Sequence, residues 1–76
     1  FYADGVRFLN PQTVYFDYGV EIGLGSIIYP GVTLVGNTKI ASNVVIETGS
    51  FIKNSQLEEG VEILANSYLE DAYVRK

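Results

Sequence analysis

The chain has 76 residues and a formal net charge of −4, and it contains neither cysteine nor histidine. This length allows one small domain, and the missing residue types exclude disulfides, cysteine-based zinc sites and histidine-based catalysis. The five Lys and Arg residues are scattered and no apolar run reaches the roughly 18 residues of a membrane span, so we expect no nucleic-acid partner, no membrane partner and a cytoplasmic location.

Residues 1–13 are expected to form a lead-in segment, because they lie outside the repeat described below and contain the turn signals Asp4-Gly5 and Asn10-Pro11. One interpretation of Phe1 and Tyr2 is the end of a preceding helix, with Gly5 near the helix carboxyl terminus. Since the sequence starts without Met and stops at Lys76 without a terminating signal, we expect a fragment of a longer chain.

A six-residue period runs through residues 14–76. Six is a multiple of the two-residue strand repeat but not of the 3.6 residues of a helical turn, so large side chains with this spacing share one face only along an extended backbone. The large apolar residues are Phe16, Ile22, Ile28, Leu34, Ile40, Ile46 and Ile52. The segment is therefore predicted to be strand and turn.

Two further rows accompany these large residues. Small or β-branched residues two positions earlier must point the same way, and they are Val14, Val20, Ser26, Val32, Thr38, Val44 and Ser50. Residue types that tolerate positive φ lie three positions later, at Gly19, Gly25, Gly31, Asn37, Asn43 and Gly49. Each unit predicts a short strand and a sharp corner, whereas a small β-sandwich has turns every 8 to 12 residues or so.

Three such units close one coil, so residue i stacks on residue i+18. The expected interior columns are Phe16 with Leu34 and Ile52, Ile22 with Ile40, and Ile28 with Ile46. The next large residue after Ile52 is Leu57, five positions on, and Ser55 replaces the usual Gly or Asn there, which indicates a tightened corner within a continuing prism. Residues 14–76 are thus predicted to form an all-β parallel β-helix, a triangular prism of about three to four coils.

The acidic residues are candidates for a carboxylate pair or a cation site, because both chemistries use clustered oxygens. We interpret them instead as a solvated surface, since Glu58 and Glu59 precede a corner at Gly60 and Glu62 lies between two inward side chains. The residues considered are Glu58, Glu59, Glu62, Glu70 and Asp71.

The glycines Gly23, Gly25 and Gly31 do not predict a phosphate-binding loop, because such loops need a helix amino terminus and usually a nearby Lys or Arg. Their spacing suits the corners of the coil. We therefore expect no catalytic, cofactor-binding or metal-binding residue in this chain.

The outward residue before each large residue gives the three flanks of the prism different characters. An aromatic flank carries Tyr15, Thr33, Phe51 and Tyr68; a polar flank carries Glu21, Lys39, Gln56 and Tyr73; a third flank carries Ile27, Val45 and Glu62. Glu21 and Lys39 are placed to pair across adjacent coils. We expect the aromatic flank, with Ile27, Tyr29 and Val35, to pack against neighbouring chains in a homotrimer.

Residues 22–27 and 28–33, IGLGSI and IYPGVT, resemble the hexapeptide signature of left-handed β-helix acyltransferases. More specific are four runs with their order and spacing. These are Asn10-Pro-Gln-Thr13, Gly19-Val-Glu-Ile22, Ile52-Lys-Asn-Ser55 and Leu69-Glu-Asp-Ala72. Together they resemble the first coils of the carboxyl-terminal domain of the bacterial bifunctional N-acetylglucosamine-1-phosphate uridyltransferase and glucosamine-1-phosphate N-acetyltransferase family.

This resemblance implies left-handed coiling, trimers, and a parent enzyme that transfers an acetyl group from acetyl-CoA to glucosamine-1-phosphate. The parent then couples the product to UTP with Mg²⁺ to make UDP-N-acetylglucosamine, a peptidoglycan precursor. In that family the catalytic His and the sugar- and CoA-binding groups lie in later coils and match no position here. The chain is therefore expected to be structural, without catalysis or a cofactor of its own.

Two alternatives remain open at the level of sequence. The chain is either a piece of another hexapeptide-repeat acyltransferase or nucleotidyltransferase, or it is a free-standing, non-catalytic assembly module. The hexapeptide pattern is shared by proteins with different reactions, because fold alone does not specify function.

Overall fold

The computed structural model describes residues 2–3 and 5–75, which form short strands joined by tight corners. Within these residues the strands are interrupted by one 3₁₀ turn, η1 (Pro11–Thr13). The strands are β1 (Tyr2–Ala3), β2 (Val6–Phe8), β3 (Tyr15–Phe16), β4 (Glu21–Ile22), β5 (Ile27–Ile28), β6 (Thr33–Val35), β7 (Lys39–Ile40), β8 (Val45–Ile46), β9 (Phe51–Lys53), β10 (Gln56–Leu57), β11 (Glu62–Ile63), β12 (Tyr68–Glu70) and β13 (Tyr73–Val74).

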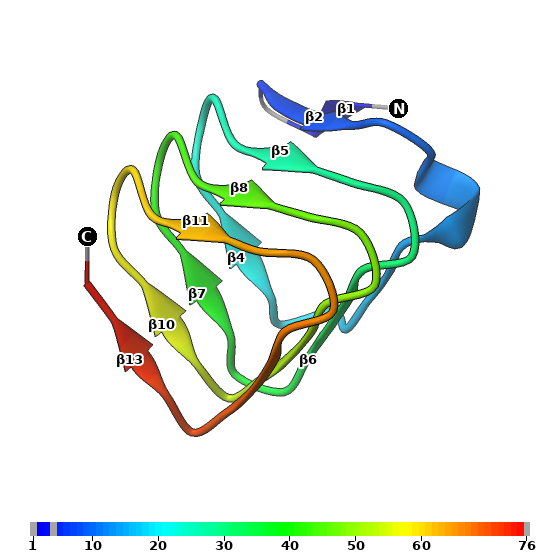
Figure 1. Cartoon of the computed structure of the whole chain (residues 1–76). Coiled ribbons are helices and arrows are strands. Elements are labelled where there is room, and N and C mark those ends of the chain that lie inside the picture. Colours follow the sequence, from blue (N-terminus) through cyan, green and yellow to red (C-terminus); the bar gives the residue numbers. More distant parts are fainter. Residues whose placement is uncertain (1, 4, 76) are drawn as a thin grey trace.

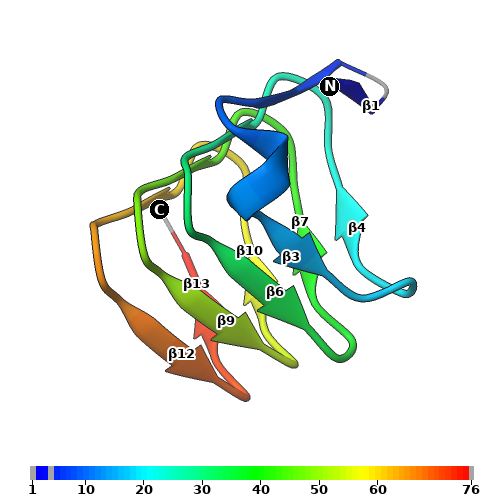
Figure 2. The ribbon, with the colours of Figure 1, turned by 90° about the vertical axis from the view of Figure 1, so that its right-hand side faces the viewer.

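The strands form three sheets that the chain visits in turn, as Figures 1 and 2 show. Sheet I has the order β1-β2-β5-β8-β11, sheet II the order β3-β6-β9-β12 and sheet III the order β4-β7-β10-β13. Apart from the antiparallel β1–β2 pair, neighbouring strands are parallel. The chain is therefore a parallel β-solenoid of about four turns with three flat sides, which confirms the predicted fold class.

The strand register confirms the predicted stacking of the columns, but Phe16, at the end of its column, is 39% exposed rather than interior. Leu34 stacks between Phe16 and Ile52, Ile40 is paired with Ile22, and Ile46 with Ile28. Ile28, Leu34, Ile46 and Ile52 are completely buried. These aliphatic layers supply most of the hydrophobic stabilisation, because each fully buried side chain of this size contributes about 1.5–3 kcal/mol.

The slip after Ile52 shortens the coil without ending it. Lys39 is the partner of Glu21, 18 residues away, but Gln56 is the partner of Lys39, 17 residues away. Leu57 remains only 2% exposed and continues the column above Ile40. The expectation of a tightened corner is therefore confirmed.

Buried hydroxyl groups hold the corners of successive coils together. Ser26 Oγ donates to the carbonyl of Ala41 at 3.0 Å and accepts from the backbone N–H of Val44 at 3.2 Å. Ser50 makes the equivalent bonds with Leu64 and Ser67. These inward polar residues are tolerated because their hydroxyls pair with backbone groups that the corners would otherwise leave unsatisfied.

The corners use left-handed backbone conformations, though not at every predicted position. Gly25, Gly31, Gly49 and Asn43 have positive φ as predicted. The remaining corner, between sheets II and III, differs from the prediction. In the second coil the residue with positive φ is Gly36 rather than Asn37, and in the third coil it is Asn54, next to Ser55. Gly19, in the first coil, does not have positive φ. The reason is that this corner turns directly after the longer strands β6 and β9, so its left-handed residue comes one position earlier.

The amino-terminal segment contributes to the prism. Strand β2 pairs with β5 and brings Val6 and Phe8 into the core. The expected helix end is wrong for Tyr2, which lies in β1 and pairs with Arg7; Phe1 lies outside the described residues. No helix in the described part of the chain is long and apolar enough to cross a membrane.

Candidate functional site

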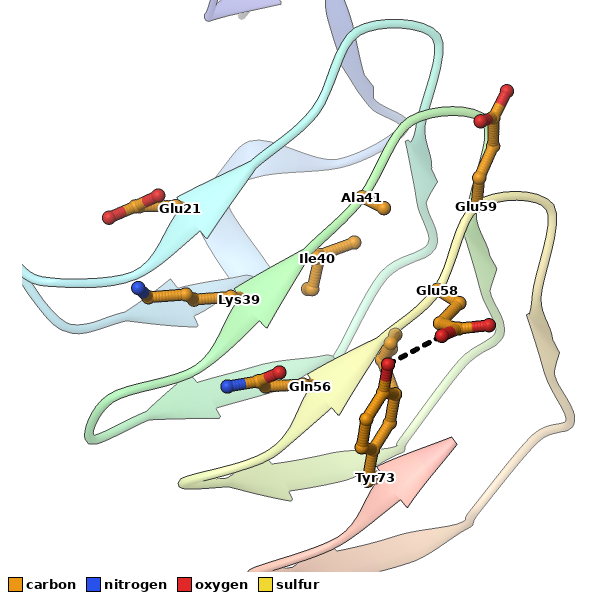
Figure 3. Close-up of a pocket in the computed structure, with 9 residues that line it drawn as sticks. Glu21, Lys39, Ile40, Ala41, Gln56, Glu58, Glu59 and Tyr73 are labelled. Atoms are coloured by element: carbon orange, nitrogen blue, oxygen red, sulfur yellow. Dashed lines mark hydrogen bonds between the residues drawn. The ribbon is translucent and has the colours of Figure 1, made fainter. Parts of the chain in front are cut away.

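An open groove of about 530 Å³ crosses the outer face of sheet III (Figure 3). Its position follows from side-chain size, because the short Ala41 occupies the outward position two residues after the long Lys39 on β7. The groove is lined by Glu21, Lys39, Ile40, Ala41, Gln56, Leu57, Glu58, Glu59 and Tyr73. Most of these are polar, so the groove is a hydrated surface rather than an enclosed apolar cavity.

One hydrogen bond organises the end of the groove nearest β13. The Tyr73 hydroxyl donates to the Glu58 carboxylate, as the dashed line in Figure 3 shows. This hydrogen bond and the negative charge of Glu58 raise the pKa of the Tyr73 phenol above its ordinary value. The Arg75 guanidinium lies 5.5 Å from the Tyr73 ring centroid, in range of a cation–π interaction. These contacts therefore fix the position of the Tyr73 side chain and do not make its phenol more acidic.

The charged residues at the other end of the groove are not paired. Glu21 and Lys39 are register partners on β4 and β7, but no ion pair joins them, so the expected bridge does not form. Two exposed and flexible side chains gain little from such a contact, because solvent screens it and holding both side chains still costs entropy.

The acidic residues considered in the sequence are dispersed over the surface. Glu58 and Glu59 lie at the corner before Gly60 and border the groove, while Glu62 points outward from β11. Glu70 approaches Lys53 at 4.0 Å and accepts a hydrogen bond from Tyr68. In the described ranges no three Asp or Glu residues are grouped closely enough to hold a metal ion.

Sequence reasoning identified the polar flank but missed the groove. Glu21, Lys39, Gln56 and Tyr73 follow from the six-residue period. Glu58 directly follows β10 at the outward position that Ala41 occupies after β7, and Glu59 lies next to it. The available signal was the pair Gly23 and Ala41, two short residues in the outward row that continues to Glu58. The groove offers hydrogen-bonding groups, and the expectation that no residue here is catalytic remains a prediction.

Sheet II carries the second candidate site, an aromatic strip of Tyr15, Phe51 and Tyr68 in which Thr33 lies between Tyr15 and Phe51 (Figure 2 shows the strands). The rings of Phe51 and Tyr68 stack with centroids 5.1 Å apart and planes 8° apart. Tyr15 is 58% exposed and Tyr68 65% exposed. Each tyrosine hydroxyl donates to a carboxylate two residues on, Asp17 or Glu70, so the strip is a rigid surface with a polar edge.

The chain is similar to part of several curated bacterial proteins, although no family model matches it. It is 41% identical over 71 residues to the bifunctional protein GlmU of Geotalea uraniireducens, covering 93% of this chain and 16% of that protein. The GlmU of Syntrophotalea carbinolica is 43% identical over 70 residues, covering 92% of this chain and 15% of that protein. The GlmU of Streptococcus agalactiae is 39% identical over 72 residues, covering 95% and 16%. The chain thus spans less than one fifth of the length of these relatives.

Proposed function

Because this chain is homologous to the carboxyl-terminal, hexapeptide-repeat region of the bifunctional GlmU proteins, we propose that it is a structural and oligomerisation segment of a bacterial sugar-nucleotide transferase. The parent transfers an acetyl group from acetyl-CoA to glucosamine-1-phosphate and then a uridyl group from UTP, with Mg²⁺, in the cytoplasm. This chain contributes coils of a left-handed prism to it. The chemistry belongs to other parts of the parent.

The observation that carries the proposal is the aromatic strip on a rigid solenoid. Phe51 and Tyr68 are stacked and supported from below by a completely buried layer at Ile52, yet Tyr15 and Tyr68 stay more than half exposed. Ordered aromatic rings on a surface favour association, because they bury a large apolar area at little cost in side-chain entropy. The strip is therefore the surface through which chains assemble into a homotrimer.

The residues of the groove support a structural role for this stretch. The groove has no histidine or cysteine to act as base or nucleophile, and its Tyr73 hydroxyl is committed to Glu58. Its carboxylates lie on an open surface groove rather than in an enclosed cavity. The acetyl-transfer and uridyl-transfer sites are accordingly assigned to the remainder of the parent.

A charge placed in the aromatic strip tests the proposal. Phe51→Glu should shift the chain from trimer to monomer in sedimentation velocity, because a carboxylate would be desolvated in the contact. Gln56→Glu adds the same charge to the polar sheet III, and it should leave the sedimentation profile unchanged. Equal sedimentation of Phe51→Glu and the unmodified chain would exclude the strip as the assembly surface.

Catalytic silence has its own test. The purified chain, incubated with acetyl-CoA and glucosamine-1-phosphate or with UTP, Mg²⁺ and N-acetylglucosamine-1-phosphate, should form no product above the protein-free rate. Product formation that disappears in Tyr73→Phe or Glu58→Gln would instead assign a reaction to the groove.

A further inference from the structure

The two tyrosines of the aromatic strip are held in different ways. The Tyr68 ring stacks on Phe51 with centroids 5.1 Å apart, and its hydroxyl also donates to Glu70. The Tyr15 ring is 58% exposed and stacks on no other ring among the described residues. Its hydroxyl donates to Asp17 Oδ1 at 2.8 Å. The order of the Tyr15 side chain therefore depends on Asp17.

The Asp17 carboxylate is itself anchored to the next coil. Its Oδ2 accepts a hydrogen bond of 2.9 Å from the Gly36 backbone N–H. One coil later the equivalent bond joins two backbone groups, because the Asn54 N–H donates to the Val35 carbonyl at 3.2 Å. In the first coil the Asp17 carbonyl accepts instead from the Val20 N–H of its own corner, at 3.1 Å. The Asp17 side chain thus replaces a backbone link between coils.

We propose that Asp17 is a positioning residue of the assembly surface, which ties Tyr15 to the backbone of the second coil and orders its ring before another chain covers it. This inference rests on the proposed function and adds to it. Association costs less when an interface side chain is already ordered, because binding then does not have to immobilise it. Asp17 acts through Tyr15 rather than through a contact of its own with the partner chain.

Both carboxylate oxygens are required for this role. An ionised carboxylate accepts hydrogen bonds with both oxygens, whereas a protonated carboxyl carries a donor on one of them. The Gly36 residue is half-buried at the corner, whereas the Tyr15 hydroxyl lies at the surface, where water can replace Asp17. Protonation of Asp17 should therefore release Tyr15 and leave the link to Gly36 in place.

Few other ionisable groups lie near the Asp17 carboxylate. On β3 its titratable neighbour is Tyr15, and the adjacent Tyr18 is fully exposed. Residues 33–38, which form β6 and the corner after it, contain no ionisable side chain. Lys53, on β9, lies two coils away from Asp17. The pH dependence of the Tyr15 contact therefore reports on Asp17.

Asp17→Asn tests the proposal, since the amide keeps the shape of the side chain but neither its charge nor its second acceptor oxygen. Sedimentation equilibrium at about pH 6.5, where carboxylates are ionised, should show about two- to tenfold weaker association than for the unmodified chain. Glu70→Gln is the matched control. It makes the same change beside Tyr68, which Phe51 already holds by stacking, so association should weaken by less than about twofold.

The pH profile separates positioning from a general loss of stability. As pH falls toward about 2.5, the ratio of the association constants of the unmodified chain and Asp17→Asn should approach one, because residue 17 is then uncharged in both. Far-ultraviolet circular dichroism limits the comparison to pH values at which both chains are folded. Over the same range the NMR signals of the Gly36 amide proton and the Tyr15 ring should shift with one common midpoint, and this readout also works in monomers.

Equal association of Asp17→Asn and the unmodified chain at neutral pH would overturn the proposal, as would Tyr15 signals that do not move with the Gly36 amide. A ratio of association constants that is the same at every pH would assign the effect of Asp17→Asn to lost stability instead. Trimers of equal affinity in both chains contradict only the role of Asp17, whereas monomers of the unmodified chain at every concentration contradict the assembly surface as well.

Discussion

Replacing Gly36 by alanine should destabilise the prism through two separable effects. Gly36 has φ +70°, and an added Cβ would overlap the Asn54 side-chain amide in the next coil. That amide is engaged, because Asn54 Oδ1 accepts a hydrogen bond of 2.9 Å from the backbone N–H of Asn37. Alanine must therefore adopt a left-handed conformation and also displace Asn54 from its partner.

The expected cost is about 1–2 kcal/mol for a non-glycine residue in the left-handed region, plus roughly 1 kcal/mol for the lost hydrogen bond. Gly36→Ala should therefore lower the free energy of unfolding by about 2–3 kcal/mol. Gly31→Ala is the matched control. Gly31 has φ +78°, but its nearest neighbour is Gly49 N at 3.5 Å, so only the backbone cost of about 1–2 kcal/mol applies.

Urea denaturation at one fixed protein concentration measures these differences, because association would make the apparent stability concentration-dependent. Asn54→Gly removes the obstructing amide while permitting the left-handed corner. In that background the cost of Gly36→Ala should fall to that of Gly31→Ala. If Gly36→Ala costs no more than Gly31→Ala, or if Asn54→Gly leaves the difference intact, the stacking of Asn54 on Gly36 does not contribute to stability.

Two further perturbations test the core and the corner electrostatics. Ile40→Ala should lower the free energy of unfolding by about 2–5 kcal/mol, since Ile40 is 3% exposed between Ile22 and Leu57; an unchanged urea midpoint would contradict the interior column. The Asp17 carboxylate accepts a hydrogen bond of 2.9 Å from the Gly36 N–H and another from the Tyr15 hydroxyl, and these two bonds hold the pKa of Asp17 below its ordinary value. The contribution of Asp17 to folding stability is therefore present above the unfolded-state pKa and is lost as pH falls through the lower folded-state pKa. Below about pH 4 the urea midpoint of the unmodified chain should therefore fall more steeply than that of Asp17→Asn, and parallel midpoint curves would refute this assignment.

The repeating part of the fold could be predicted because its physical signal is redundant. Large residues such as Leu34, small residues such as Val32 and turn residues such as Gly31 each repeat independently with one period, and together they specify strand, interior face and corner. The five-residue step at Leu57 was also interpretable, since the next residues resume the same order. The strand register, the interior columns and the continuation of the prism past Ile52 could all be predicted from these three rows of residues.

The deviations arise where contacts between distant residues decide the local structure. Strand β2 precedes the period, and Phe8 is buried because it pairs with Ile28. The left-handed residue of the corner after β6 is Gly36 rather than Asn37, because the corner begins directly after this three-residue strand. The groove combines Glu58 and Glu59, which directly follow β10, with side chains from β4, β7 and β13 in other coils, so no local pattern outlines it.

Sedimentation equilibrium of the unmodified chain tests the central claim, that this segment assembles chains, most directly. We expect a concentration-dependent species with three times the 8.4 kDa mass of one chain. A single species of 8.4 kDa at every concentration up to the solubility limit would contradict it, because the apolar faces of sheets I and II would then be stable in water without a partner copy.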